Sequence, residues 1–314
     1  MKRPLRFLLC LMVGSVAIGS VANGMVPIAQ AQESASNSAA QSDAQEAILR
    51  YKLKPGQVLS SEVTHLAKTD TRIEKTEQSS QSRTISKKVW EVTKVEPNGN
   101  ATFVMRVDQV DMSQQVGDGE EIRYNSATDK EPPEVYKTVA DSLNKPIATI
   151  TIDKRGVVVS RDNKASTSTL GMGDVTITFP EEAVKLESEW DVPREIRVRL
   201  EDGGSKVIKV REVYRLEKIR SGVATISVRS EPLTPYDDPA IEAQVVQQMS
   251  NGTVKFDIDA GQMISKELQW NESIVGFSGP GSMMTYSARY NEEVKVAPAT
   301  NTATRKSGPV NQRK

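Results

Sequence analysis

Apolar and polar residues alternate with a period of two through most of the middle of the chain, and this pattern predicts β-strands. Ile196, Val198 and Leu200 alternate with charged residues, which buries one face of a strand and exposes the other. The turn-forming sequence Asp202-Gly203-Gly204 follows, and Val207 to Leu216 returns as the partner strand. We therefore expect an antiparallel hairpin in this part of the chain.

The first half of the chain carries the same kind of pattern. Ile85 to Val95 is typical of a strand, Pro97-Asn98-Gly99 of a turn, and Ala101 to Val107 of the returning strand. The returning strand would place Phe103 and Met105 on one face. This predicts a second antiparallel hairpin with the same plan as the first.

Two short helices are predicted between the strands, one in each half. Pro133 opens the first; Asp238 caps the second, with Pro239 at its first position and Gly252 as its glycine stop. The apolar residues at helical spacing are Val135, Val139 and Leu143 in the first helix and Ile241, Val245 and Met249 in the second. Each helix leads into a further tight hairpin.

Matching segments indicate that the body is an internal duplication. The segments beginning at Ala101 and Ala224 match at an offset of 123 residues, and the pairs beginning at Ile152 and Ile258 match at an offset of 106. The change of offset places 17 extra residues in the first half, in the polar loop around Gly117 to Glu121. Two such units side by side can cover each other's open sheet edges and apolar faces.

The predicted fold is mainly β, built from two tandem β-rich repeats with one short helix each. The repeats span residues 47–162 and 179–295, and residues 163–178 link them. Three arrangements remain open at this stage: one curved antiparallel sheet, a sandwich, or a half-barrel. Strand register, which decides among them, cannot be derived from this pattern.

The first 31 residues are predicted to be an export signal. Lys2, Arg3 and Arg6 precede the uncharged apolar segment Phe7 to Val21, and Ala29-Gln30-Ala31 supplies a small-x-small cleavage pattern. Cleavage after Ala22 and an uncleaved membrane anchor are the alternatives. Residues 32–46 and the basic tail, 296–314, have compositions typical of disorder. We therefore expect an exported protein, periplasmic or extracellular, with no transmembrane span after cleavage.

Composition excludes several classes of function. The chain has 41 basic and 41 acidic side chains, so it lacks the basic excess of a nucleic-acid-binding protein. One Cys and one His build neither a disulfide nor a zinc centre, and we expect no metal or cofactor. Cys10 lies inside the signal, too early for a lipid anchor. After cleavage 38 basic side chains face 41 acidic ones, a net charge of −3.

The order of motifs in the chain resembles that of a family of uncharacterised secreted proteins that is abundant in planctomycete-type bacteria. The segments that carry the resemblance begin at Arg50, Lys88, Ala148, Leu170 and Asn251 and read RYKLKPG, KVWEV, ATITID, LGMG and NGTVKFDID. The resemblance implies secretion and a β fold, and it assigns no functional residue. The family tends to have Gly where this chain has Glu187, so we expect a different turn there.

Candidate catalytic residues are few, and we expect no enzymatic activity. His65 is the sole imidazole, and no Gly-x-Ser-x-Gly elbow accompanies it. The acidic pairs are Glu120-Glu121, Glu181-Glu182, Asp237-Asp238 and, two apart, Asp257 and Asp259; all lie in or beside turns, where acidic residues are common. Trp90, Trp190 and Trp270 are interpreted as core anchors, with a carbohydrate or lipid site as the alternative.

The leading hypothesis is a non-enzymatic cell-envelope protein, a scaffold or interaction module with an unidentified envelope partner. The first alternative is a carrier that holds a lipid or other apolar ligand in a concave sheet. Its pocket would be lined by Phe103, Met105, Val139, Val245, Met249 and Phe256. The second alternative is a carboxylate-dependent hydrolase, which requires two carboxylates facing one cleft. The oligomeric state is not predicted.

Overall fold

The computed structural model describes residues 45–163 and 176–296; the signal, the tail and Gly171-Met172-Gly173 lie outside them. The described strands are β1 (Glu46–Ala47), β2 (Val58–Ile73), β3 (Thr76–Val95), β4 (Ala101–Val116), β5 (Ile122–Asn125), β6 (Ala148–Ile152), β7 (Val158–Asn163), β8 (Val184–Lys185), β9 (Glu189–Arg199), β10 (Ser205–Arg220), β11 (Val223–Pro232), β12 (Asn251–Asp257), β13 (Gln262–Val275) and β14 (Met283–Val296). The helices are η1 (Glu134–Tyr136), α1 (Lys137–Ser142), α2 (Pro239–Val245) and η3 (Val246–Gln248).

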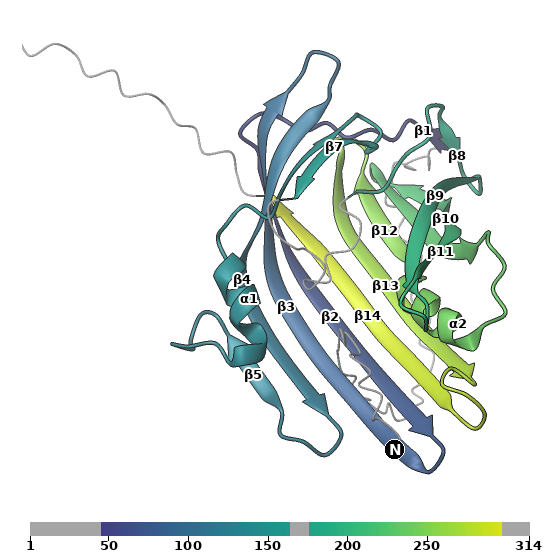
Figure 1. The fold of residues 1–314 in the computed structure, drawn as a ribbon. Coiled ribbons are helices and arrows are strands. Elements are labelled where there is room, and N and C mark those ends of the chain that lie inside the picture. Colours follow the sequence, from purple (N-terminus) through teal and green to yellow (C-terminus); the bar gives the residue numbers. More distant parts are fainter. Residues whose placement is uncertain (1–44, 164–175, 297–314) are drawn as a thin grey trace, which may run out of the picture.

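One antiparallel sheet of 12 strands makes up most of the molecule (Figure 1). Its order is β7-β6-β4-β3-β2-β14-β13-β12-β11-β10-β9, with β5 added beside β4, and β1 pairs separately with β8. Strands β2 and β14 pair from Arg72 and Met283 at one end to Leu59 and Val296 at the other. This seam joins the first half of the chain to the second, and the edge strands β7 and β9 stay unpaired with each other.

The sheet is strongly curved (Figure 1). Helix α2 contacts both β9 and β13, although β10, β11 and β12 lie between them in the sheet. On a flat sheet these two strands would be about 19 Å apart, too far for one helix to touch both. The sheet therefore bends around α2, and the concave face is the face that α2 covers.

The main hydrophobic core fills the concave side at one end of the sheet. The chain around Tyr51 closes this end: its backbone N–H donates to the carbonyl of Lys154 in the β6–β7 turn, and the next N–H donates to Gly261 in the β12–β13 turn. The Tyr51 ring lies 5.4 Å from Phe179 and 5.3 Å from Phe256, between ring centroids. Because these partners come from both halves of the chain, the halves share one core.

The predicted fold class is confirmed as mainly antiparallel β with two short helices, in the form of one continuous curved sheet. The local signals also hold. Asp238 accepts a hydrogen bond from the Ala240 backbone at the start of α2, and Pro239 is the first helical residue. Gly203 adopts φ 85° in the predicted β9–β10 turn.

Two local predictions are wrong. Gly252 does not end a helix; it lies inside β12, because the alternation of buried Val254 and Phe256 continues the strand through it. The extra residues of the first half are not a polar loop alone. They extend β4 to Val116 and add β5, whose Tyr124 is buried and pairs with Met112.

The turns that lead into the two halves have the same backbone conformation. Gly56 has φ 76° and Glu187 has φ 67°, so the turn at Glu187 does not differ, contrary to our expectation. Each of these two residues donates its N–H to the second strand of its half, to Val92 and Leu216 respectively. In return, the backbone N–H groups of Val92 and Leu216 donate to the carbonyls of Gln57 and Ser188, the residues that follow Gly56 and Glu187. The shared bonds support the duplication, which itself stays an inference from the sequence.

These turns allow a test of backbone strain alone. A Cβ added at Gly56 meets nothing within 4 Å, so Gly56→Ala should cost only the left-handed conformation, about 1 kcal/mol of unfolding free energy. Glu187→Gly should raise the unfolding free energy by up to about 1 kcal/mol, because glycine adopts the left-handed conformation without strain. The loss of the exposed ion pair between Glu187 and Arg215 subtracts a small part of this gain. Urea denaturation of both variants measures this, and a loss of stability in Glu187→Gly would contradict it.

Candidate functional site

The middle of the concave face is formed by the central strands β3, β2, β14 and β13. Alternation directs every second residue inward, in the phase that also contains the core residues Leu59 and Trp90. The inward residues are Ser80, Ser82, Thr84, Ser86 and Lys88 on β3, Ser61, Val63, His65, Ala67 and Thr69 on β2, Tyr286, Ala288, Tyr290 and Glu292 on β14, and Lys266, Leu268 and Trp270 on β13. This face is therefore unusually polar for the inside of a sheet.

A buried ion pair joins β3 to β14 across the intervening strand β2. Lys88 Nζ lies 2.5 Å from Glu292 Oε1, and both side chains are 1–2% exposed. Ser61 donates to the same carboxylate oxygen at 2.7 Å, and Tyr290 donates to Oε2 at 2.6 Å. Both oxygens of Glu292 are thus occupied by three partners from three strands.

Burial and pairing act in opposite directions on these groups. Burial alone would raise the pKa of Glu292, but Lys88, with the Tyr290 and Ser61 hydroxyls, holds it below its ordinary value. Burial lowers the pKa of Lys88, and Glu292 opposes that shift. For Tyr290, burial and the neighbouring carboxylate both raise the pKa well above its ordinary value. The Glu292 carboxylate is therefore ionised at neutral pH, and the Tyr290 phenol stays protonated.

A second lysine lies beside this pair on the same face. Lys266 on β13 is directly opposite Glu292 in the register and is buried, with 7% of its surface exposed. Among the described residues no carboxylate lies within ion-pair distance of its ammonium group. The concave face therefore holds two buried cations and one buried anion.

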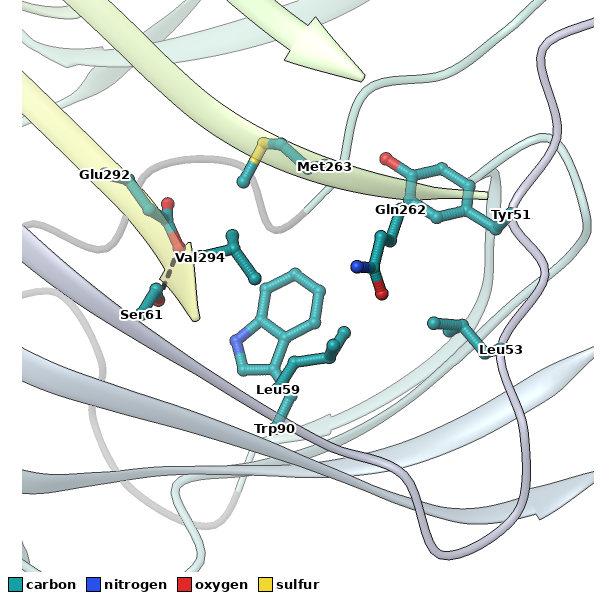
Figure 2. A pocket seen from close by; sticks show the side chains of 9 residues that line it. All are labelled: Tyr51, Leu53, Leu59, Ser61, Trp90, Gln262, Met263, Glu292 and Val294. Carbon is teal, nitrogen blue, oxygen red and sulfur yellow. Dashed lines mark hydrogen bonds between the residues drawn. The ribbon is translucent and has the colours of Figure 1, made fainter. Parts of the chain in front are cut away.

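A small cavity adjoins the ion pair (Figure 2). Its volume is about 20 Å³, room for about one water molecule. Figure 2 shows the Trp90 indole facing Met263 and Gln262, with Ser61 bonded to Glu292 at one side. The indole N–H of Trp90 is buried without a hydrogen-bond partner among the described residues. This cavity is too small for an acyl chain.

Further along the concave face, aromatic side chains surround His65. The His65 ring lies 6.3 Å from Trp270 and 6.4 Å from Tyr290, between ring centroids. Burial lowers the pKa of His65 to about 4, because the ring loses water without gaining an acidic partner. His65 and Trp270 are both partly exposed. The neutral imidazole and the indole form an apolar surface, and the indole N–H of Trp270 is buried without a hydrogen-bond partner among the described residues.

The concave face ends at a rim formed by hairpin tips. Ile73 on β2, Val116 on β4 and Ile122 on β5 lie there in the inward phase, and they are 40%, 43% and 37% exposed. Branched apolar side chains are costly to leave in water. The rim and the partly exposed His65 ring give this end of the concave face an accessible apolar character. Beside Trp270, in contrast, Ala67 and Tyr286 are buried in a cluster with Ala243 and Val246 of α2 and η3.

The residues predicted to line a carrier pocket lie in two packed clusters. Phe103, Met105, Val139 and Phe256 belong to the main core, whereas Val245 and Met249 pack against β9 and β10. None of the six lines the cavity of Figure 2.

The three tryptophans lie in different surroundings. Trp90 stacks on Phe103 at 4.8 Å, and Trp190 stacks on Tyr214 at 5.5 Å and donates to the Thr178 carbonyl. Trp270 lies at the edge of a smaller cluster with Ala67 and Tyr286. Trp90 and Trp190 thus anchor the core, and Trp270 faces the concave side.

Several residues of the acidic pairs have structural partners. Asp238 caps α2, Glu121 bonds Arg123, and Glu181 lies 3.7 Å from Arg155. Asp257 accepts from the Ala260 backbone, the turn role expected of it. Within residues 45–163 and 176–296 no group of three potential metal ligands occurs.

The sequence reasoning missed Lys88, Glu292 and Lys266. A signal was present: each charge occupies a position in the buried phase of its strand, Lys88 two residues before Trp90 and Lys266 two before Leu268. A charged residue at a strand position that should face the core is a candidate for a buried ion pair. Its partner on another strand can be identified only when the strand register is known.

Comparisons with known proteins return little. No family model and no curated protein matches the chain. Among solved structures it is similar to lipovitellin, in a structure that concerns lipid–protein interactions, at 13% identity and a TM-score of 0.42. The match covers 80% of this chain and 27% of that chain. A likeness of this size does not bear on function.

Proposed function

We propose that the protein is an exported, non-enzymatic binding protein that holds an amphipathic or apolar ligand on the concave face of its sheet. The ligand lies along the inward residues between the ion pair and the rim, over His65 and Trp270. The carrier predicted from the sequence placed the ligand among core residues such as Phe103; the proposed site lies further along the same face.

The observation that carries the proposal is the accessible aromatic and apolar surface on an otherwise small-residue face. Beside His65 and Trp270, the inward residues of β3 are Ser80, Ser82, Thr84 and Ser86, and Ala67 lies next to His65 on β2. Ser82, Thr84 and His65 are partly exposed, and the rim adds exposed Ile73, Val116 and Ile122. Such surfaces bind ligands or partners more often than they face water.

Export and the lack of catalysis rest on separate grounds. The apolar segment Phe7 to Val21 with its basic start supports export. Among the described residues His65 has aromatic neighbours and no acidic partner, and Asp257 and Asp238 serve a turn and a cap. These observations support a non-enzymatic role. Within the described residues no helix is long and apolar enough to cross a membrane. A scaffold role has no comparable residue set to carry it.

Filling the concave face should block binding. Thr84 pairs with His65 in the register, so Thr84→Trp places an indole where the ligand would lie. We expect the dissociation constant of a neutral fluorescent probe, N-phenyl-1-naphthylamine, to rise about tenfold or more, a loss of about 1.4 kcal/mol. Probe titration of the purified protein measures this.

Thr93→Trp is the matched control, since Thr93 lies on the same strand and is exposed. It should leave probe affinity unchanged. Absence of saturable probe binding by the unaltered protein, or equal binding by both tryptophan variants, would contradict the proposed site. Circular dichroism of both variants checks that the sheet is intact.

A further inference from the structure

The four central strands carry four charged side chains in the inward phase, Lys88, Lys266, Glu292 and Glu272, and Lys266 has no ion-pair partner among the described residues. Lys88 is neutralised by Glu292 at 2.5 Å, and the remaining capacity of that carboxylate is taken by Ser61 and Tyr290. Lys266 lies opposite Glu292 on the neighbouring strand but makes no ion pair with it. The ammonium group of Lys266 is therefore an uncompensated charge.

The Lys266 ammonium lies close to a second cation and has no opposite charge of its own. The side chain is 7% exposed, and its Nζ is not among the described polar atoms that are shut off from solvent without a hydrogen-bond partner, so the ammonium keeps contact with solvent. Its charge disfavours the charged form of Lys88. A bound anion would offset this repulsion.

We propose that Lys266 binds the negatively charged head group of the ligand, and that this head group is a carboxylate on a long apolar chain. The inference rests on the proposed function, which supplies the surface for the chain.

The placement of Lys266 fits a chain that runs along the sheet. Leu268 follows it in the inward phase of β13, but beyond Trp270 that strand is covered, because Ile274 packs with Ala243 and Val246 of α2 and η3. The route to the rim therefore runs over β2, from Val63, which is level with Glu292 and Lys266 in the register, to Ile73. These ten residues at about 3.4 Å each give about 34 Å, enough for an extended long-chain acyl group. The head therefore lies near the ion pair, and the tail passes Trp270 and His65 toward the rim.

The charge and donor type favour a carboxylate over a phosphate. One uncompensated ammonium matches a single negative charge, and phosphate sites more often use the fork of an arginine. The arginines on these four described strands, Arg72, Arg83 and Arg289, occupy the outward phase. The inward face thus offers a lysine and no guanidinium.

A pair of probes with the same chain separates head-group recognition from chain binding. cis-Parinaric acid and its methyl ester differ only in the carboxylate charge. The unaltered protein should bind the acid about tenfold or more tightly than the ester, the range of one charge-assisted bond. Lys266→Met should weaken the acid to the level of the ester and leave the ester unchanged.

Lys255→Met is the control, because Lys255 is an exposed lysine on neighbouring β12 and its replacement removes the same charge elsewhere. It should retain the preference for the acid. Lys266→Met should not lower the midpoint of urea unfolding, since methionine has a similar volume and the substitution removes the repulsion of Lys88. This measurement shows that any binding loss is not a folding defect.

The outcomes distinguish the two proposals. Equal binding of acid and ester by the unaltered protein overturns the head-group inference and leaves the binding function standing. Binding of neither probe overturns both. Displacement of the acid by lysophosphatidate at much lower concentration than by oleate overturns the carboxylate assignment in favour of phosphate. Loss of ester binding in Lys266→Met would show a structural role and also overturns the inference.

Discussion

Replacing Lys88 by methionine should lower the free energy of unfolding by about 3 kcal/mol at pH 7. The substitution leaves Glu292 in the interior with its charge unpaired, and breaking a buried pair in this way typically costs 3–5 kcal/mol. We expect the lower end of that range, because Ser61 and Tyr290 still donate to the carboxylate. Urea denaturation followed by circular dichroism gives the value.

Two companion variants show whether the charge is responsible. Lys87→Met removes the exposed neighbouring lysine and should change stability by no more than about 0.5 kcal/mol. The double variant Lys88→Met with Glu292→Leu removes both charges and should recover most of the lost stability. If the double variant is no more stable than Lys88→Met, the loss came from packing and the unpaired charge is not its cause.

The pH dependence adds a second readout. In the unaltered protein the pKa of Glu292 is held below its ordinary value. The ionised carboxylate therefore stabilises the fold at a pH above its unfolded-state pKa, and this stabilisation is lost as pH falls through its folded-state pKa. Without Lys88, burial raises the pKa of Glu292 instead. The penalty of Lys88→Met should therefore shrink as pH falls toward 4, because protonation removes the unpaired charge.

Acidification should destabilise the protein through His65 by about 3 kcal/mol between pH 7 and pH 4. The pKa of His65 is lowered to about 4 by burial, whereas the unfolded chain protonates near pH 6.5. Between these values only the unfolded state takes up the proton, so stability falls by about 1.4 kcal/mol per pH unit. The contribution of His65 to the unfolding free energy is fully present above pH 6.5 and is lost as pH falls to 4.

His65→Phe isolates this effect, since the phenyl ring keeps the contacts with Trp270 and Tyr290 and cannot be protonated. As pH falls from 7, the unaltered protein should lose unfolding free energy through His65, whereas His65→Phe should not. The variant should therefore become more stable relative to the unaltered protein. His65 is the chain's one histidine, so no other imidazole contributes to this range. Parallel stability curves would show that the ring is not desolvated.

Features set by neighbouring residues could be predicted from the sequence. The cap at Asp238, the turn at Gly203 and the turn role of Asp257 depend on a side chain and the backbone beside it. Gly252 shows the limit of such rules, because a glycine that suits a helix end also suits a strand that approaches a neighbouring backbone closely. A Cβ there would lie 1.9 Å from the carbonyl oxygen of Glu267.

The candidate site could not be predicted, because it depends on register between distant segments. Ser61 and Glu292 are 231 residues apart, and they meet because β2 and β14 pair at one register and not at another. A shift of one residue would turn Glu292 outward into water. The alternation at Lys88 showed which phase is buried, but the strand that brings its partner was not visible.

The seam between β2 and β14 also orders the events of synthesis. During synthesis β2 is made before every other strand of the large sheet, and β14 is made last, so β2 remains an unpaired edge until the rest of the described chain exists. An open edge of 16 residues is a template for wrong pairing, and contacts of such sequence separation close slowly. A truncation before Met283 should therefore leave this edge open and aggregate.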